Sequence, residues 1–352
     1  MKKSKNLQQI LSFLFLLLTL GVVLWIGLNG NDLSELMSAL KRLSPGYLLL
    51  CFASWVLYVL ADALAIHHFL IVQKTPVRLW QSIHAAIVGI YYCNITPGAS
   101  GGQPMQMYCL SKYKVPIGVS GSAVAVKFVV FQAVLLLTGA VLWPLHGRFV
   151  AEYAGSSIWF VLLGYVVNFF SIGMVLMMAI STRAVRWVIE RCICIGMRLK
   201  ICKDPDASRT KWENHCQSFL SSVQQVVRRP ADLVIQCLIA FIQLMSLMLV
   251  IIAVYHAFGL SGVGTTELIT MGVLLYIAAS YTPLPGASGA QEGGFAVMFR
   301  DIFPEAHCFV ALLIWRFATY YLSVLVGAVV TSVENIRSLR KSSAEEEVNP
   351  EN

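Results

Sequence analysis

The stretch Pro97-Gly98-Ala99-Ser100-Gly101 occurs a second time in this chain, as Pro285-Gly286-Ala287-Ser288-Gly289. Each copy is followed at the same offset by a glutamine, and further downstream by one cation inside an apolar run. These residues are Gln103 and Gln291, then Lys127 and Arg316. A lone Pro-Gly pair would indicate only a turn. The shared order of phrase, glutamine and cation predicts that two halves of the chain follow one plan.

The composition identifies the medium in which these halves lie. Apolar residues make up 57% of the 352 residues and charged residues only 12%, whereas soluble domains carry about 25% charged residues. We therefore expect an all-α integral membrane protein and exclude an ordinary soluble domain.

About six apolar runs are long enough to cross a bilayer as helices. They are Ile10–Leu28, Tyr47–Val72, Val119–Leu142, Ile158–Ile180, Leu233–Phe258 and Phe309–Val330. The first run is longer than the apolar core of a signal peptide, and no small-residue cleavage site follows it. It is therefore predicted to be an uncleaved span.

Two shorter apolar runs, Trp80–Cys93 and Leu268–Tyr281, each end at a copy of the repeated phrase. A helix of about 14 residues rises roughly 21 Å, which is less than the ~30 Å hydrocarbon core. Proline and glycine then favour an unwound tip, which in a membrane must be buried in protein or line a wet cavity. We expect two re-entrant helical hairpins.

The positive charges predict the topology. With both termini in the cytoplasm, the outside segments hold only Lys41, Arg42, Arg148 and Arg300 among the lysines and arginines, as the positive-inside rule requires. The two hairpins then enter from opposite faces, which is the pattern of an inverted repeat with its substrate site near the midplane.

The predicted organisation follows from these spans. Residues 1–335 form the membrane domain, whose halves are about 47–180 and 232–332. Residues 182–230 are a cytoplasmic amphipathic linker with helices at Arg183–Ile201 and Trp212–Val227, and residues 336–352 are a polar cytoplasmic tail.

The hairpin tips are the predicted binding site. Helix N-termini favour anions such as a lipid phosphate, and a cation at the centre of a span costs about 2.5–3.5 kcal/mol unless it faces a partner or a cavity. The candidate substrate-binding residues are Asn94, Thr96, Pro97, Gly98, Ser100, Gly101, Gly102, Gln103, Lys127, Pro285, Gly286, Ser288, Gly289, Gln291, Glu292 and Arg316.

Only one of the two copies has an acidic residue beside the repeated phrase. Glu292 is the expected partner of Arg316, and the pair either serves the substrate or simply fixes helix packing. The first copy has Pro104 at the matching position, so Lys127 is expected to lack an acid and either to meet the phosphate itself or to snorkel to the cytoplasmic face. Asp62 is a candidate proton relay or substrate contact, but we expect it at a solvated helix end.

Cofactor motifs are missing from the sequence. The cysteines fit no zinc spacing, and neither a phosphate-binding loop with its lysine nor a nucleophile elbow is found. We expect no metal, no cofactor and no catalytic residue, and the net charge of +8 is attributed to the inside loops rather than to nucleic-acid binding.

Four segments of the sequence carry a family resemblance. They are Asn94-Ile95-Thr96-Pro97-Gly98, Gly101-Gly102-Gln103-Pro104, Tyr108-x-Leu110 and Pro283-x-Pro285-Gly286-x-x-Gly289-x-x-Glu292. From about residue 10 to 335, the chain resembles the lysylphosphatidylglycerol synthase transmembrane family, which is described as flippase-like. The resemblance implies a membrane domain that moves lipid across the bilayer. Some members add a soluble domain that transfers an aminoacyl group from tRNA. Few residues follow Val330, so we expect that domain to be absent.

The sequence therefore favours a multi-pass cell-membrane flippase for an anionic or aminoacylated phospholipid, namely phosphatidylglycerol, its lysyl derivative or a related lipid-linked headgroup. A separate soluble transferase is a possible partner. One alternative is a phosphatidylglycerol lysyltransferase with a role in resistance to cationic antimicrobial peptides, for which tRNA would be a partner. Another is a small-solute or ion transporter.

Overall fold

The structure, a computed structural model, describes residues 21, 41, 43–75, 77–180 and 205–348. All regular elements in these ranges are helical. The helical segments among them that are long and apolar enough to cross a membrane are Pro45–Val72, Ile117–Leu145, Ile158–Met177, Pro230–Ala257 and His307–Glu334. The chain is therefore an all-α, multi-pass membrane protein. Apart from Gly21, the predicted span Ile10–Leu28 lies outside the described residues, and so does the predicted helix Arg183–Ile201.

An antiparallel pair of long helices, α3 (Pro45–Val72) and α11 (Pro230–Ala257), forms the centre of the bundle. Each helix starts at a proline, whose fixed φ and missing N–H suit a first helical turn. The backbone N–H of Ser44 donates to the carbonyl of Ala257 at 3.1 Å, so the start of α3 lies beside the end of α11. Small buried side chains on both helices, such as Ala61 and Ala240, allow the close approach typical of membrane helices.

Helices α6 (Ile117–Leu145) and α8 (Ile158–Ile180) lie on the outside of this pair, joined by the short α7 (Gly147–Ala154). Trp159 and Phe169 of α8 are 70% and 72% exposed. Such apolar faces suit a helix whose surroundings are lipid. The predicted amphipathic helix before Pro230 is confirmed as α10 (Pro205–Val227), which packs on α6.

Both short apolar runs form the first arm of a helical hairpin, as predicted. In the first hairpin, α4 (Leu79–Ile95) leads through the 3-10 turn η1 (Pro97–Ala99) into α5 (Gly102–Lys112). In the second, α12 (Thr265–Ala279) leads through η3 (Pro285–Ala287) into α13 (Ala290–Met298). With 17 residues in α4 and 15 in α12, neither arm spans a bilayer upright.

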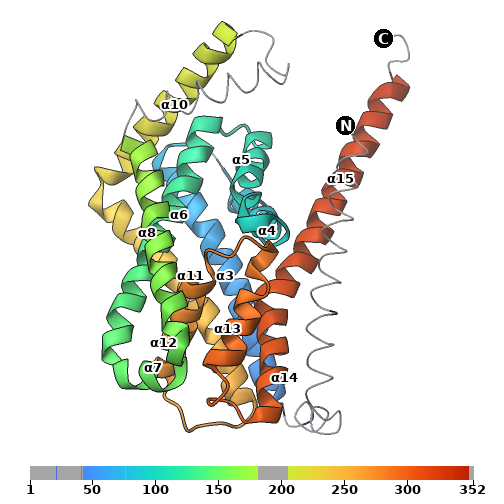
Figure 1. The fold of residues 1–352 in the computed structure, drawn as a ribbon. Coiled ribbons are helices and arrows are strands. Elements are labelled where there is room, and N and C mark those ends of the chain that lie inside the picture. The colour runs from blue at the N-terminus through green and yellow to red at the C-terminus, as the bar shows by residue number, and fades with distance from the viewer. Residues whose placement is uncertain (1–20, 22–40, 42, 76, 181–204, 349–352) are drawn as a thin grey trace.

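The hairpins enter from opposite ends of the bundle (Figure 1). The first follows the end of α3, where the side-chain amide of Gln73 donates to the carbonyl of Ser222 in α10 at 3.0 Å. The second follows the end of α11, at the far end of α3. Their tips η1 and η3 are in contact with each other. The arrangement is the one expected of an inverted repeat, although the repeat itself stays a prediction.

The last span changes its winding directly after Arg316. Helix α14 (Glu305–Arg316) passes through a π-helical turn, η4 (Phe317–Tyr321), into α15 (Leu322–Val348). Such turns often occur at functional sites. Near the α10 end, the Lys112 ammonium at the end of α5 donates to Glu334 of α15 at 2.6 Å. Partial burial opposes ionisation of Lys112, but the bond and the charge of Glu334 outweigh it and raise the Lys112 pKa.

Candidate functional site

The repeated phrase forms the same turn in both hairpins. Gly98 and Gly286 adopt left-handed φ values of 59° and 60°, and the alanines that follow them, Ala99 and Ala287, have φ values of 55° and 50°. Glycine adopts this conformation without the steric penalty of other residues. The sequence identity of the two phrases therefore extends to the backbone of their Pro-Gly-Ala turn, whereas the backbone differs from the serine onward, with ψ of −24° at Ser100 and 144° at Ser288.

Beyond the turn, the two tips differ in how their helices start. The N–H of Gly101 donates to the hydroxyl of Thr96 at 2.8 Å, whereas the N–H of Gly289 donates to the carboxylate of Glu292 at 2.7 Å. Residues 97–100 are exposed, but Pro285 and Ser288 are buried. The second tip is therefore fixed inside the protein, while the first lies at its surface.

This difference gives a matched pair of substitutions. A β-carbon at Gly286 would overlap the ring of Tyr320, whereas one at Gly98 would meet open space. Gly98→Ala is expected to cost only the left-handed strain, about 1–2 kcal/mol. Gly286→Ala adds a clash with a buried ring and should destabilise the protein considerably more. Thermal unfolding of both variants in detergent tests this, and equal losses would contradict it.

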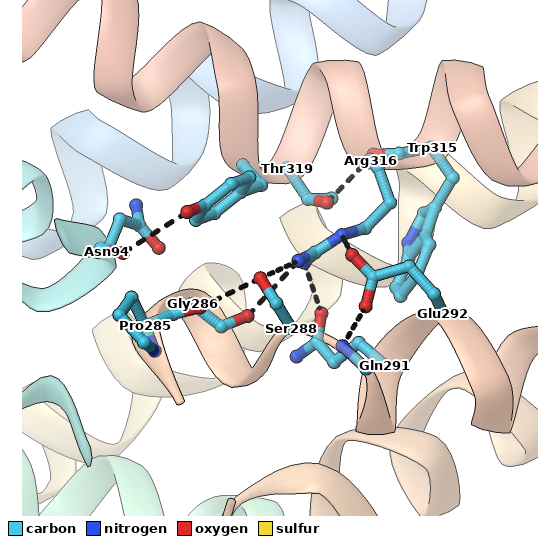
Figure 2. A network of polar contacts seen from close by, with 11 residues as sticks. Asn94, Pro285, Gly286, Ser288, Gln291, Glu292, Trp315, Arg316 and Thr319 are labelled. Carbon is cyan, nitrogen blue, oxygen red and sulfur yellow. Dashed lines mark hydrogen bonds and ion pairs between the residues drawn. The ribbon is translucent and has the colours of Figure 1, made fainter. Parts of the chain in front are cut away.

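Arg316 binds the second tip through its whole guanidinium group (Figure 2). Its Nε donates to Glu292 at 2.7 Å, and its Nη1 donates to the side-chain carbonyl of Gln291 at 2.8 Å. Its Nη2 reaches the carbonyl of Gly286 at 3.2 Å and the hydroxyl of Ser288 at 3.4 Å. The predicted Glu292 partner is confirmed, and the contacts favour the interpretation that this pair fixes packing.

Tyr320 connects this network to the first hairpin. The guanidinium carbon of Arg316 lies 4.5 Å from the centre of the Tyr320 ring, within the range of cation–π attraction. The Tyr320 hydroxyl donates to the backbone carbonyl of Asn94 at 3.4 Å. Because Asn94 lies in the last turn of α4, one side chain of the last span contacts both hairpins.

Lys127 of α6 also has an acid, contrary to the prediction. Its ammonium donates to the two carboxylate oxygens of Asp62 at 2.7 and 2.8 Å and to the side-chain carbonyl of Gln106 at 3.0 Å. The carboxylate accepts further bonds from the amides of Gln106 and Gln243, at 3.0 and 3.1 Å. This cluster joins α3, α5, α6 and α11.

Two predictions are corrected by this cluster. Asp62 was expected at a solvated helix end, but it is only 4% exposed, because α3 runs on to Val72 and is covered by α4, α6 and α11. Lys127 was expected to lack an acid because Pro104 replaces the glutamate of the second tip. The acid comes instead from a preceding span.

Two neighbouring cavities lie inside the bundle, and the second of them lies between the hairpin tips. The first, of about 240 Å³, is lined by Asp62, Gln106, Lys127 and Gln243 among others. The second, of about 230 Å³, is lined by Gly286, Gln291, Arg316 and Tyr320 among others. Both cavities share the lining residues Tyr58, Ile90, Cys93 and Asn94. Asp62 and Lys127 therefore line the first part, and Arg316 the second part, of a space formed by two neighbouring cavities.

The structure brings some of the predicted site residues to this space. Those that line it are Asn94, Gly98, Gln103, Lys127, Gly286, Gln291 and Arg316. The others shape or support the tips, and they are Thr96, Pro97, Ser100, Gly101, Gly102, Pro285, Ser288, Gly289 and Glu292. That these residues bind substrate stays a prediction.

Sequence reasoning missed Gln106, Gln243 and Tyr58. Gln106 and Gln243 are buried in the Asp62 cluster, and Tyr58 lines both cavities. The available signal was polarity inside an apolar span, since such residues face the bundle interior and serve function more often than chance. Gln243 gives this signal most clearly.

The comparison with family models bears directly on this site. The model described as Lysylphosphatidylglycerol synthase TM region matches residues 9–327, which include both hairpins and both ion pairs. The chain belongs to this family. The resemblance inferred from the two hairpin motifs is thus confirmed. A search among curated proteins found no match.

Proposed function

We propose that this member of the lysylphosphatidylglycerol synthase transmembrane family moves a phospholipid between leaflets. The proposed substrate carries a phosphate in its headgroup and is either anionic or aminoacylated, as in phosphatidylglycerol or its lysyl derivative. The observation that carries the proposal is the pair of neighbouring cavities beside the opposed hairpin tips, one lined by Asp62 and Lys127 and the other by Arg316.

The size of the cavity supports a headgroup rather than a whole lipid. Small-molecule sites typically measure about 300–1,000 Å³, and the two cavities, at about 240 and 230 Å³, reach this scale only when joined. Acyl chains would stay in the bilayer while the polar headgroup passes the tips. The exposed first tip, residues 97–100, offers an entry beside the lipid.

The proposed orientation puts the protein in the cell membrane with both termini in the cytoplasm. In that orientation the first hairpin opens to the cytoplasm, with Lys112 and Lys114 at its end, and the second opens to the outside. Rocking of one half against the other around fixed tips would then expose the cavity to each side in turn.

Filling the cavity tests the proposal. Cys93 lines both cavities, so Cys93→Trp should reduce transfer of fluorescent phosphatidylglycerol in reconstituted vesicles to the rate of protein-free vesicles. Cys237, which is exposed on α11, provides the matched control, and Cys237→Trp should transfer lipid as the wild type does. Thermal unfolding of both variants shows that they are folded.

Two further measurements, one in the same vesicles and one in a host cell, discriminate between the proposed function and its alternatives. Wild-type protein that moves no lipid but carries a trapped solute would favour a small-solute transporter. Lysylphosphatidylglycerol detected by mass spectrometry in a host that otherwise lacks it, on expression of this chain alone, would favour the transferase. Either result would overturn the proposal.

A further inference from the structure

The Asp62–Lys127 pair has no free donor for an arriving anion. A lysine ammonium has three N–H groups, and Lys127 directs its contacts to the two oxygens of Asp62 and to Gln106. The pair is neutral as a whole, and its side chains are only 6% and 13% exposed for Asp62 and Lys127. A phosphate can therefore bind Lys127 only if Asp62 gives up its contacts.

The charge balance shows what must accompany the phosphate. A phosphate monoanion added to a neutral pair leaves one net negative charge in a largely dehydrated place, which is costly. A proton placed on Asp62 restores neutrality, because the ammonium then balances the phosphate alone. The protonated carboxyl also needs an acceptor, and the amides of Gln106 and Gln243 offer a carbonyl oxygen as well as an N–H.

The second ion pair does not have this freedom. The other oxygen of Glu292 accepts from the N–H of Gly289 at the start of α13, and Arg316 is bound to several acceptors of the tip. Protonating Glu292 would loosen the hairpin. By contrast, the hydrogen bonds described for the Asp62 carboxylate all come from side chains, so its charge can change without loss of backbone structure.

We infer that the cavity binds a proton at Asp62 together with the headgroup phosphate at Lys127, so that lipid movement is coupled to proton movement. This inference rests on the proposed function. The proton adds to a carboxylate oxygen of Asp62, and the N–H groups of Lys127 turn from that carboxylate to the phosphate oxygens. When the phosphate leaves on the other side, the proton leaves and the ion pair forms again. For a lipid with one net negative charge, such as phosphatidylglycerol, the cycle is electroneutral.

Other titratable groups surround Asp62 and must be distinguished from it. Lys127 faces it from α6, and Tyr58 and Cys93 from α3 and α4 interact with its charge, while Tyr276 of α12 interacts with Tyr58. The elements α5 and α11 contribute the amides described above. Farther along α3, His68 lies 3.4 Å from Asp232 of α11. Histidine titrates between about pH 5 and about pH 8, so His68→Gln is the necessary control.

The test uses the full chain in phosphatidylcholine vesicles that contain phosphatidylglycerol with a fluorophore on one acyl chain. A gradient of one pH unit is a tenfold ratio of proton concentrations. If one proton moves with each lipid, this gradient should sustain about a tenfold difference in labelled lipid between the leaflets, because equal concentration ratios correspond to equal free energies. A trapped pH dye should report proton flux only when the labelled or unlabelled phosphatidylglycerol is present. Clamping the membrane potential should change neither result.

Asp62→Asn is the decisive variant. It keeps the shape of the side chain and, like a protonated carboxyl, offers both an acceptor and a donor, and the ammonium that it leaves unpaired lines the cavity. It should equalise labelled lipid between leaflets regardless of the pH gradient, without proton flux, whereas His68→Gln should keep the gradient response. A gradient response that persists in Asp62→Asn would overturn the inference.

The wild type alone also decides the question if the variant does not fold. Lipid transfer without proton flux or gradient response in the wild type would overturn the coupling and leave the proposed function intact. The absence of lipid transfer at every pH would instead contradict the proposed function itself.

Discussion

Arg316→Lys is expected to destabilise the second hairpin by an amount of the same order as Arg316→Ala. Removing one partner of a buried ion pair costs about 3–5 kcal/mol, because the other charge is left uncompensated. Lysine would keep the charge. However, three different nitrogens of the planar guanidinium group donate to Glu292, Gln291 and the carbonyl of Gly286, and a single ammonium cannot make all three hydrogen bonds.

The measurement combines thermal unfolding in detergent with hydrogen exchange of residues 285–298. Both Arg316 variants should lower the unfolding temperature and speed exchange at the tip. Arg300→Lys is the matched control, since Arg300 follows α13, the helix that begins at the second tip, but is exposed, and it should behave as the wild type does. If Arg316→Lys unfolded at the same temperature as the wild type, a positive charge alone would stabilise the second tip, and the planar shape of the guanidinium group would not be needed.

The parts of the fold that sequence predicted were those set by local chemistry. The Pro-Gly phrases marked the ends of α4 and α12, and helix lengths followed from apolar runs. Glu292 and Arg316 were matched correctly because the contact spans only 24 positions and lies within one hairpin and the next helix. These features depend on neighbours that the sequence places close together.

The Asp62–Lys127 pair could not be found in the same way. The partners are 65 positions apart, and only the packing of α3 against α6 and α11 brings them together. Comparison of the two repeated phrases predicted no acid for Lys127, because Pro104 stands where the second copy has Glu292. It failed because the first half takes its acid from the span before the hairpin, so the two copies share a turn but not the arrangement around their cations.

A second large effect is expected when the charges of this pair are removed singly and together. Lys127→Met leaves Asp62 buried without its cation and should destabilise the protein by about 3–5 kcal/mol. The double variant Asp62→Asn with Lys127→Met removes both charges and should recover most of that loss, since replacing a buried pair with neutral groups of similar size is often close to neutral. Thermal unfolding of the wild type, both single variants and the double variant gives the coupling between the two residues.

Lipid transfer by the same four proteins separates stability from function. The double variant should fold and yet transfer labelled phosphatidylglycerol no faster than protein-free vesicles, because no ammonium remains to receive the phosphate. If it both folded and transferred lipid at the wild-type rate, Lys127 would be a packing element and the phosphate would have to bind elsewhere. Arg316 would not be that place while its guanidinium is occupied by the second tip. We therefore expect Lys127 to be the cation that exchanges partners, since its acid, Asp62 of α3, lies outside both hairpins and can release it without unfolding a hairpin.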